Sequence, residues 1–76
     1  MLTDEFGKRL KYWRNKRGLS LKDLRSKCGV AVESISKYEH GRIFPTLKTV
    51  EILLDALNVS IVDFYSETDY KESSEI

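Results

Sequence analysis

A stretch of fourteen residues, 29–42, constrains the fold of this chain more than any other feature, and its sequence is GVAVESISKYEHGR. Gly29 interrupts one apolar helical pattern, and Val30 and Ile35 begin another. Glycine readily adopts the left-handed backbone conformation that ends a helix. The stretch therefore predicts two short helices joined by a tight turn. The second helix carries small or polar side chains on its outer face, namely Val32, Glu33, Ser34, Ser36 and Lys37.

The apolar spacing before this stretch predicts a longer first helix. Phe6, Leu10 and Trp13 recur at spacings of four and three residues, which is typical of one helix face. We expect this helix over residues 6–16, after a frayed start at residues 1–5. The remaining helices have expected N-caps at Ser20, Thr46 and Ser60, and Asp23 completes a capping box with the first of these. They are expected over residues 21–28, 32–39, 47–57 and 61–65.

The whole pattern predicts one all-α domain, a compact five-helix bundle over residues 1–66. No alternating strand pattern and no internal repeat is present in the sequence. Residues 67–76 are polar and acidic, and we expect them to form a flexible tail. Seven residues at helical spacing are expected in the core: Trp13, Leu24, Ile35, Tyr38, Leu47, Leu53 and Leu57.

Charge is divided unevenly along the chain. Residues 1–48 hold 12 Lys+Arg and 5 Asp+Glu, a net charge of +7, whereas residues 49–76 hold 1 and 7, a net charge of −6. A basic surface suits a phosphate-rich partner because each neutralised phosphate releases counterions. A basic surface kept only for solubility is the alternative. The basic residues cluster around the 29–42 stretch, which favours nucleic acid.

Other features of the sequence bear on its compartment. No apolar stretch approaches the roughly 20 residues that span a bilayer. The N-terminal sequence MLTDEFGK is acidic where a signal peptide would be basic. The single cysteine, Cys28, cannot form an internal disulfide, which agrees with a reducing compartment. We expect a cytoplasmic protein with no membrane partner.

Two short helices joined at a glycine, the second with a polar outer face, form the layout of a helix-turn-helix motif. The second helix of such a motif fits the major groove of DNA, where each base pair presents a distinct pattern of donors and acceptors. We therefore expect the chain to bind double-stranded DNA in a sequence-specific way.

The order of these signals resembles the Cro/repressor-like helix-turn-helix family, often called the XRE family, along residues 6–65. The matching stretches are FGKRLKYWR, LSLKDLRSKCGV, SISKYEHG and PTLKTVEILLDALNVS. The resemblance implies a five-helix bundle of the lambda-repressor-like type. It also implies a transcriptional regulator, a repressor or autoregulator, that binds a pseudo-palindromic operator as a homodimer.

The resemblance implies roles for individual residues. Base contacts are expected from Val32, Glu33, Ser34 and Lys37, with Ser36 beside them. Phosphate contacts are expected from the start of the second helix, from the turn after the third helix and from nearby cations: Ser20, Leu21, Lys22, His40, Gly41, Arg42 and Lys48. Arg14 and Glu39 occupy the positions of a structural ion pair.

The chemistry of the outer residues fits base contact. Lys37 can donate to guanine, Glu33 can accept from cytosine N4, and Val32 can touch a thymine methyl group. Alternatively, Glu33 and Lys37 stabilise their own helix as a pair four residues apart. Four apolar residues need not all be absorbed by the core of one molecule, and we expect them at a two-fold interface: Ile52, Ile61, Val62 and Tyr65. The alternative is that some of them close the bottom of the core.

The sequence departs from the family pattern at three positions. Leu21 stands where a glutamine is common, and Arg25 replaces a small alanine, which should alter the approach of the second and third helices. Ala31 replaces the usual polar cap, which weakens the start of the third helix by about 1 kcal/mol.

A protein-interaction module, such as an antitoxin or an antirepressor partner, is the alternative function. Such a protein should keep the fold and lose salt-dependent affinity for DNA. An enzyme has the least support, because nothing resembles a preorganised catalytic site. One cysteine, Cys28, and one histidine, His40, cannot make a zinc site without carboxylates. We therefore expect no catalytic residue, no metal, no cofactor and no small-molecule ligand.

Overall fold

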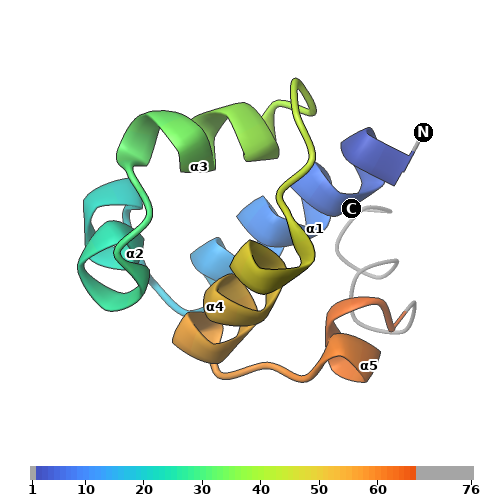
Figure 1. The fold of residues 1–76 in the computed structure, drawn as a ribbon. Coiled ribbons are helices and arrows are strands. Elements are labelled where there is room, and N and C mark those ends of the chain that lie inside the picture. Colours follow the sequence, from blue (N-terminus) through green and yellow to red (C-terminus); the bar gives the residue numbers. More distant parts are fainter. Residues whose placement is uncertain (1, 67–76) are drawn as a thin grey trace.

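The computed structural model describes residues 2–66, and these residues form five α-helices without a strand (Figure 1). The helices are α1 (Leu2–Lys16), α2 (Leu21–Cys28), α3 (Val32–Glu39), α4 (Leu47–Leu57) and α5 (Ile61–Phe64). The prediction of an all-α five-helix bundle is confirmed. The predicted tail, residues 67–76, lies outside the described residues. No described helix is long and apolar enough to cross a membrane.

The helix boundaries follow the predicted capping residues. Ser20 and Asp23 form a complete capping box at the start of α2, in which Ser20 Oγ accepts the Asp23 N–H at 3.0 Å. The hydroxyls of Thr46 and Ser60 likewise accept backbone N–H groups at the starts of α4 and α5. Ala31 makes no such bond at the start of α3, as its side chain predicts.

The first helix begins at Leu2, so the prediction of a frayed start at residues 1–5 is wrong. Asp4 and Glu5 lie in the first turn, where their negative charges interact favourably with the positive end of the helix dipole. Glu5 also pairs with Arg9 one turn later. The apolar stripe starts only at Phe6, and for this reason the spacing alone placed the start of the helix too late.

The core lies where α1, α3, α4 and α5 converge with one leucine of α2. Its fully buried side chains are Phe6, Leu10, Leu24, Ile35, Leu53, Leu57 and Phe64. Cys28 is half-buried against this cluster. Leu47 was predicted in the core and is 79% exposed, which contradicts the prediction. Helical side chains lean toward the N-terminus, so the side chain of the first residue of α4 extends past the end of the helix, away from the bundle.

Arg9 of α1 and Arg17, the residue after α1, hold the ends of the two C-terminal helices. Arg17 donates from Nε to the carbonyl oxygen of Leu57 at 2.7 Å, at the end of α4. Arg9 is buried and donates from Nη1 to the carbonyl oxygens of Phe64 and Ser66, at 3.2 and 3.1 Å. The Leu57 and Phe64 carbonyls belong to the groups that a helix C-terminus leaves without intrahelical partners. The position of α5 is therefore fixed from α1.

A glycine allows α1 to approach the end of α3 closely. A Cβ atom added to Gly7 would overlap the carbonyl oxygen of Tyr38 and lie 2.8 Å from that of Glu39. Both contacts are with backbone atoms, which cannot rotate away. The absence of a side chain at Gly7 therefore lets α3 lie against α1, with its outer face turned away from the bundle (Figure 1).

Candidate nucleic-acid interface

The outer face of α3 and the start of α2 enclose a groove of about 410 Å³. Its lining residues are Leu21, Val32, Glu33, Ser36, Lys37, His40 and Arg42. Residues four apart on a helix share a face, and this spacing aligns Val32 with Ser36 and Glu33 with Lys37. The helix thus brings four of the five predicted base-contacting residues together. The fifth, Ser34, is half-buried and does not line the groove.

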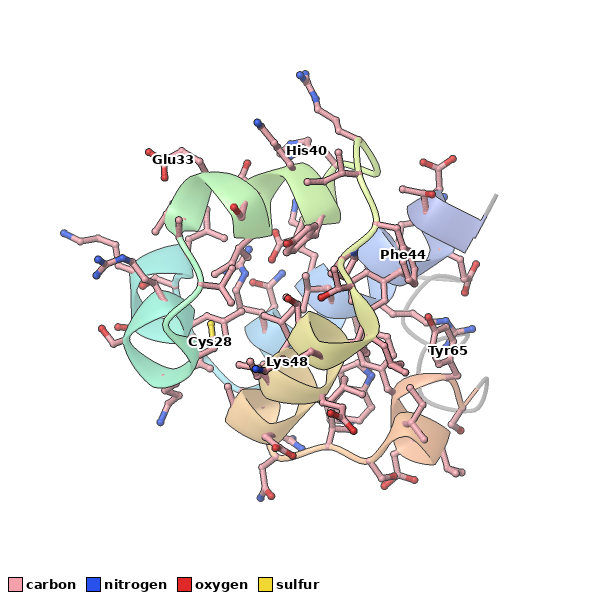
Figure 2. The ribbon with its side chains drawn as sticks, viewed as in Figure 1. Cys28, Glu33, His40, Phe44, Lys48 and Tyr65 are labelled. Atoms are coloured by element: carbon pink, nitrogen blue, oxygen red, sulfur yellow. The ribbon has the colours of Figure 1, made fainter. Side chains whose placement is uncertain are left out.

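The groove carries charges of both signs. Lys37 and Arg42 contribute cations, and Glu33 contributes a carboxylate, and all three side chains are exposed. Figure 2 shows Glu33 and His40 on the outer face of α3, pointing away from the bundle. The face thus carries both hydrogen-bond donors and acceptors, the two kinds of group that base edges present in the major groove.

The start of α2 presents two free backbone donors beside the groove. The capping box occupies the N–H groups of Ser20 and Asp23. Within residues 2–66, the N–H groups of Leu21 and Lys22 make no hydrogen bond. Free N–H groups and the helix dipole favour an anion at such an end. Three residues here were predicted to contact phosphate, namely Ser20, Leu21 and Lys22. Of these, Leu21 and Lys22 have free N–H groups that could donate to an anion.

The capping box also changes the titration of Asp23. Its carboxylate accepts the backbone N–H of Ser20 at 2.9 Å, and the Ser20 side chain adds a second hydrogen bond. These bonds lower the pKa of Asp23 below its ordinary value. The exposed carboxylate thus remains charged at the start of α2.

The turn after α3 satisfies its own backbone donors. The N–H groups of His40, Gly41 and Arg42 donate to the carbonyl oxygens of Ser36, Tyr38 and Lys37, at 3.0, 3.1 and 2.9 Å. Gly41 has a left-handed φ of 72° and lies directly against Asp4. Gly41 was predicted to contact phosphate, but its N–H is already used within the turn. The side chain of Arg42, in the same turn, is exposed.

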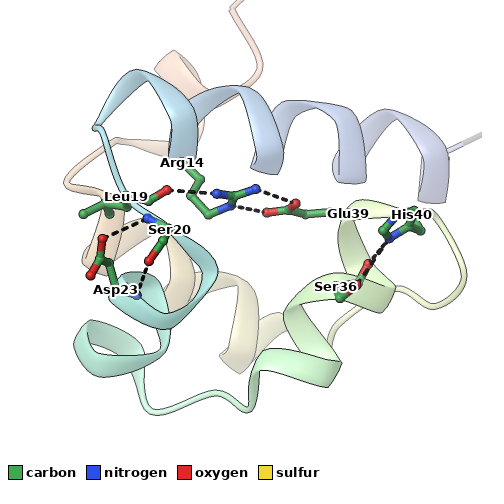
Figure 3. A network of polar contacts seen from close by, with 7 residues as sticks. All are labelled: Arg14, Leu19, Ser20, Asp23, Ser36, Glu39 and His40. Carbon is green, nitrogen blue, oxygen red and sulfur yellow. Dashed lines mark hydrogen bonds and ion pairs between the residues drawn. The ribbon is translucent and has the colours of Figure 1, made fainter.

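Arg14 and Glu39 form the predicted ion pair beneath the helix-turn-helix (Figure 3). The hydrogen bonds to Glu39 raise the pKa of Arg14 above its ordinary value, against the opposing effect of burial. Arg14 also donates from Nη1 to the carbonyl oxygen of Leu19 at 2.9 Å. One guanidinium thus links the end of α1, the loop before α2 and the end of α3.

A model of the helix-turn-helix family matches residues 10–64, most of the chain. The chain belongs to the helix-turn-helix family. This is the family that the XRE-type resemblance indicated.

A curated relative and several solved structures share this family and fold. The chain is 31% identical over 62 residues to the HTH-type transcriptional regulator DdrOP3 of Deinococcus deserti, covering 82% of this chain. It spans about half of that relative, 48% of its length. The restriction-modification controller protein C.Esp1396I, solved as a tetramer with its natural 35 base-pair operator, has a TM-score of 0.81 and 29% identity, covering 95% of this chain and 93% of that one.

A second controller protein, C.AhdI from Aeromonas hydrophila, has a TM-score of 0.78 and 25% identity. The match covers 83% of this chain and 96% of that one. The five helices therefore have the Cro/lambda-repressor-like arrangement of the helix-turn-helix family.

The structure places α5, which carries two of the predicted interface residues, away from α3. Ile61 and Val62 of α5 are 52% and 74% exposed. Ile52 and Tyr65 are half-buried, and burial raises the pKa of Tyr65. Figure 1 shows α5 on the opposite side of the molecule from α2 and α3. A contact through α5 would therefore leave the groove open.

Not every predicted residue joins the groove. Lys48 is exposed at the start of α4 and does not line it, and Figure 2 shows Lys48 apart from Glu33 and His40. Figure 2 also shows Cys28 far from His40, so these two residues form no common site. Among the described residues, no group of three or more His, Cys, Asp or Glu side chains could hold a metal ion.

Sequence reasoning missed Gly7, which lets α3 lie against α1, and Arg9, which fixes α5 from α1. The signal for Arg9 was its place three residues after Phe6, at the edge of the apolar stripe. Its partners are carbonyl oxygens 55 and 57 residues away, which no local pattern indicates. Gly7 lies inside a predicted helix, where glycine is unfavourable and therefore suggests a close approach.

Proposed function

We propose that this protein is a DNA-binding transcription regulator that inserts the outer face of α3 into the major groove. The observation that carries the proposal is the groove on that face, lined by Glu33, Ser36 and Lys37 and open to solvent. Lys37 supplies a donor for guanine, Glu33 an acceptor for cytosine N4, and Ser36 a group that can do either. Membership of the helix-turn-helix family and the likeness to DdrOP3 support this proposal.

Phosphate contacts would orient α3 on the duplex. We assign them to the free N–H groups of Leu21 and Lys22, to the Lys22 ammonium and to the Arg42 guanidinium, with Lys48 as an outlying cation. Leu21 and Lys22 lie at the start of α2, and Arg42 lies beyond the end of α3. These three residues therefore flank the base-contacting face. Such contacts fix register and contribute affinity without reading sequence.

Two copies would bind one operator. The related controller protein C.Esp1396I is a tetramer on its operator, which supports an oligomeric form. We propose a homodimer that pairs the surfaces of Ile52, Ile61, Val62 and Tyr65 about a two-fold axis. It would present two α3 helices to half-sites about 34 Å apart, and the operator would be pseudo-palindromic. We assign the protein to the cytoplasm with the DNA and assign it no catalysis.

The first experiment is selection of binding sites from a random duplex library with the full chain. The expected winners contain two related half-sites in inverted orientation. Binding by anisotropy then compares the selected duplex with a scrambled duplex at two salt concentrations. Equal affinity for both duplexes would contradict base reading, and the absence of salt-dependent binding would favour a protein-interaction module.

Variants separate base contact from phosphate contact. Lys37→Ala should weaken binding to the selected duplex more than to the scrambled duplex. Arg42→Ala should weaken both equally and reduce the salt slope by about one. Lys27→Ala is the control, since this exposed cation lies at the other end of α2 from the free N–H groups. An equal loss on both duplexes for Lys37→Ala would remove Lys37 from the base-contacting set.

A further inference from the structure

We infer that His40 determines specificity by accepting a hydrogen bond from the exocyclic amino group of a base, adenine N6 or cytosine N4. The inference rests on the proposed function and deepens it. It also changes the role of His40, which the family resemblance placed among the phosphate contacts.

The position of His40 aligns it with the base-contacting side chains. It follows the last residue of α3, four residues after Ser36 and three after Lys37, and lines the same groove. Its side chain is exposed on the outer face of the helix (Figure 2). His40 therefore extends the row formed by Val32 and Ser36 by one helical turn.

A backbone contact fixes which ring nitrogen carries the hydrogen. His40 Nδ1 lies 2.8 Å from the carbonyl oxygen of Ser36 and 3.4 Å from the Ser36 hydroxyl (Figure 3). A carbonyl oxygen only accepts hydrogen bonds, so Nδ1 must be the donor in the shorter contact. In the neutral imidazole the other nitrogen, Nε2, then bears a lone pair and acts as an acceptor.

An outward acceptor discriminates between the possible partners on DNA. Phosphate oxygens are themselves acceptors. The one N–H of the neutral ring already donates to the Ser36 carbonyl, so the ring has no donor left for a phosphate. In the major groove the hydrogen-bond donors on base edges are adenine N6 and cytosine N4. Arg42, which has donors only, is suited to the phosphates from the same end of α3. His40 thus fits a base rather than the backbone.

The first test reads the ring directly in the free protein. His40 is the only histidine in the chain. A two-dimensional ¹H–¹⁵N spectrum that correlates the carbon-bound ring protons with the ring nitrogens therefore has one imidazole to assign. At about pH 8, above the usual range of histidine titration, we expect the Nδ1–H form. An Nε2–H ring would overturn the inference before any DNA is added.

The second test uses base analogues in the selected duplex. Each adenine is replaced in turn by purine, and each cytosine by pyrimidin-2-one, so that one exocyclic amino group is removed at a time. At one position in each half-site the wild type should lose affinity about tenfold, and His40→Ala should show no further loss there. The analogue that produces this coupling distinguishes adenine from cytosine.

Two further results would overturn the inference. If His40→Ala weakens the selected and scrambled duplexes equally and His40→Lys restores both, the ring contacts phosphate. If His40→Ala binds both duplexes as the wild type does, the ring contacts neither a base nor a phosphate. In both cases a loss of base preference in Lys37→Ala would leave the proposed function standing. Circular dichroism of His40→Ala checks its fold, and we expect no change because the side chain is exposed.

Discussion

Arg14 and Glu39 form a two-bonded ion pair, with Arg14 Nε 2.7 Å from Glu39 Oε2 and Nη2 3.0 Å from Oε1 (Figure 3). Their side chains are 11% and 5% exposed. Since the same guanidinium also binds the Leu19 carbonyl, Arg14 ties the loop before α2 and the end of α3 to α1. The pair therefore helps to hold the helices of the helix-turn-helix in their relative positions. Its contribution to stability depends on both partners being present.

Removing both partners together should cost clearly less than the two single removals added. Arg14→Met leaves the Glu39 carboxylate buried and unpaired, and Glu39→Met does the same to Arg14, so each should lower the free energy of unfolding by about 3 kcal/mol. The double variant should lose clearly less than the sum of the two. Urea denaturation of the four proteins measures the coupling. Additive losses would show that the charges do not depend on each other.

The close approach at Gly7 predicts that Gly7→Ala destabilises the protein, the opposite of the usual effect of this substitution in a helix. In an open helix, Gly→Ala is stabilising by roughly 0.5–1 kcal/mol. At Gly7 the added methyl group would overlap the Tyr38 carbonyl, and we expect a loss of about 2 kcal/mol in the free energy of unfolding. Gly18→Ala is the control, because Gly18 has a φ of 71° and open space around it. There only backbone strain of about 1 kcal/mol should appear. Increased stability of Gly7→Ala would contradict the close packing of α1 on α3.

Local chemistry explains which features the sequence predicted. Helix caps form between groups a few residues apart, so the sequence itself reveals them. Examples are Ser20 with Asp23, Gly29 and Asn58. The outer face of α3 was likewise predictable from helical spacing. Arg9 and Arg17 act instead on carbonyl groups that only the folded chain brings near. No periodicity indicates such long-range contacts.

Two residues show where spacing and side-chain type are insufficient. Leu47 continues the apolar spacing of α4, but it is exposed although Val50, three residues later on the same spacing, is buried. Ser34 is polar and close to the outer positions of α3, yet it lies on the flank, outside the groove. Both depend on how the helices pack against each other, which is a property of the folded molecule.

The exposure of Leu47 can be checked against a buried leucine of the same helix. Leu47→Ala should change the free energy of unfolding by less than about 0.5 kcal/mol, because its side chain is already in solvent. Leu53→Ala, which removes a fully buried side chain, should cost about 3 kcal/mol. Chemical denaturation measures both. Similar losses for the two variants would place Leu47 in the core.

The capping box at the start of α2 predicts a pH-dependent contribution to stability. Because Asp23 has a lower pKa in the folded protein than its ordinary value of 3.8, its ionised form favours folding. This contribution is present above that value and is lost as the pH falls through the folded-state pKa. The melting temperature of Asp23→Asn should therefore lie below that of the wild type at neutral pH, and the difference should shrink in acid. Asp55→Asn, at an exposed carboxylate of α4, should not show this pattern.

The proposed dimer surface predicts an effect on assembly without an effect on folding. Val62 is 74% exposed on α5, and Arg9 holds the carbonyl oxygens at the end of that helix. Val62→Asp would place two carboxylates against each other across a two-fold axis, so self-association should weaken by at least about tenfold while the melting transition of the monomer is retained. Sedimentation equilibrium over a range of protein concentrations measures the dissociation constant.

Leu47→Asp is the matched control for this surface, since Leu47 is equally apolar and 79% exposed but lies at the start of α4. It should leave self-association unchanged. On a selected duplex with two half-sites, Val62→Asp should bind with a lower apparent affinity than the wild type. On a single half-site the two proteins should bind alike, because α5 lies on the opposite side of the molecule from α2 and α3. If Val62→Asp dimerises normally and Leu47→Asp does not, the copies meet through the start of α4, and the α5 interface is wrong.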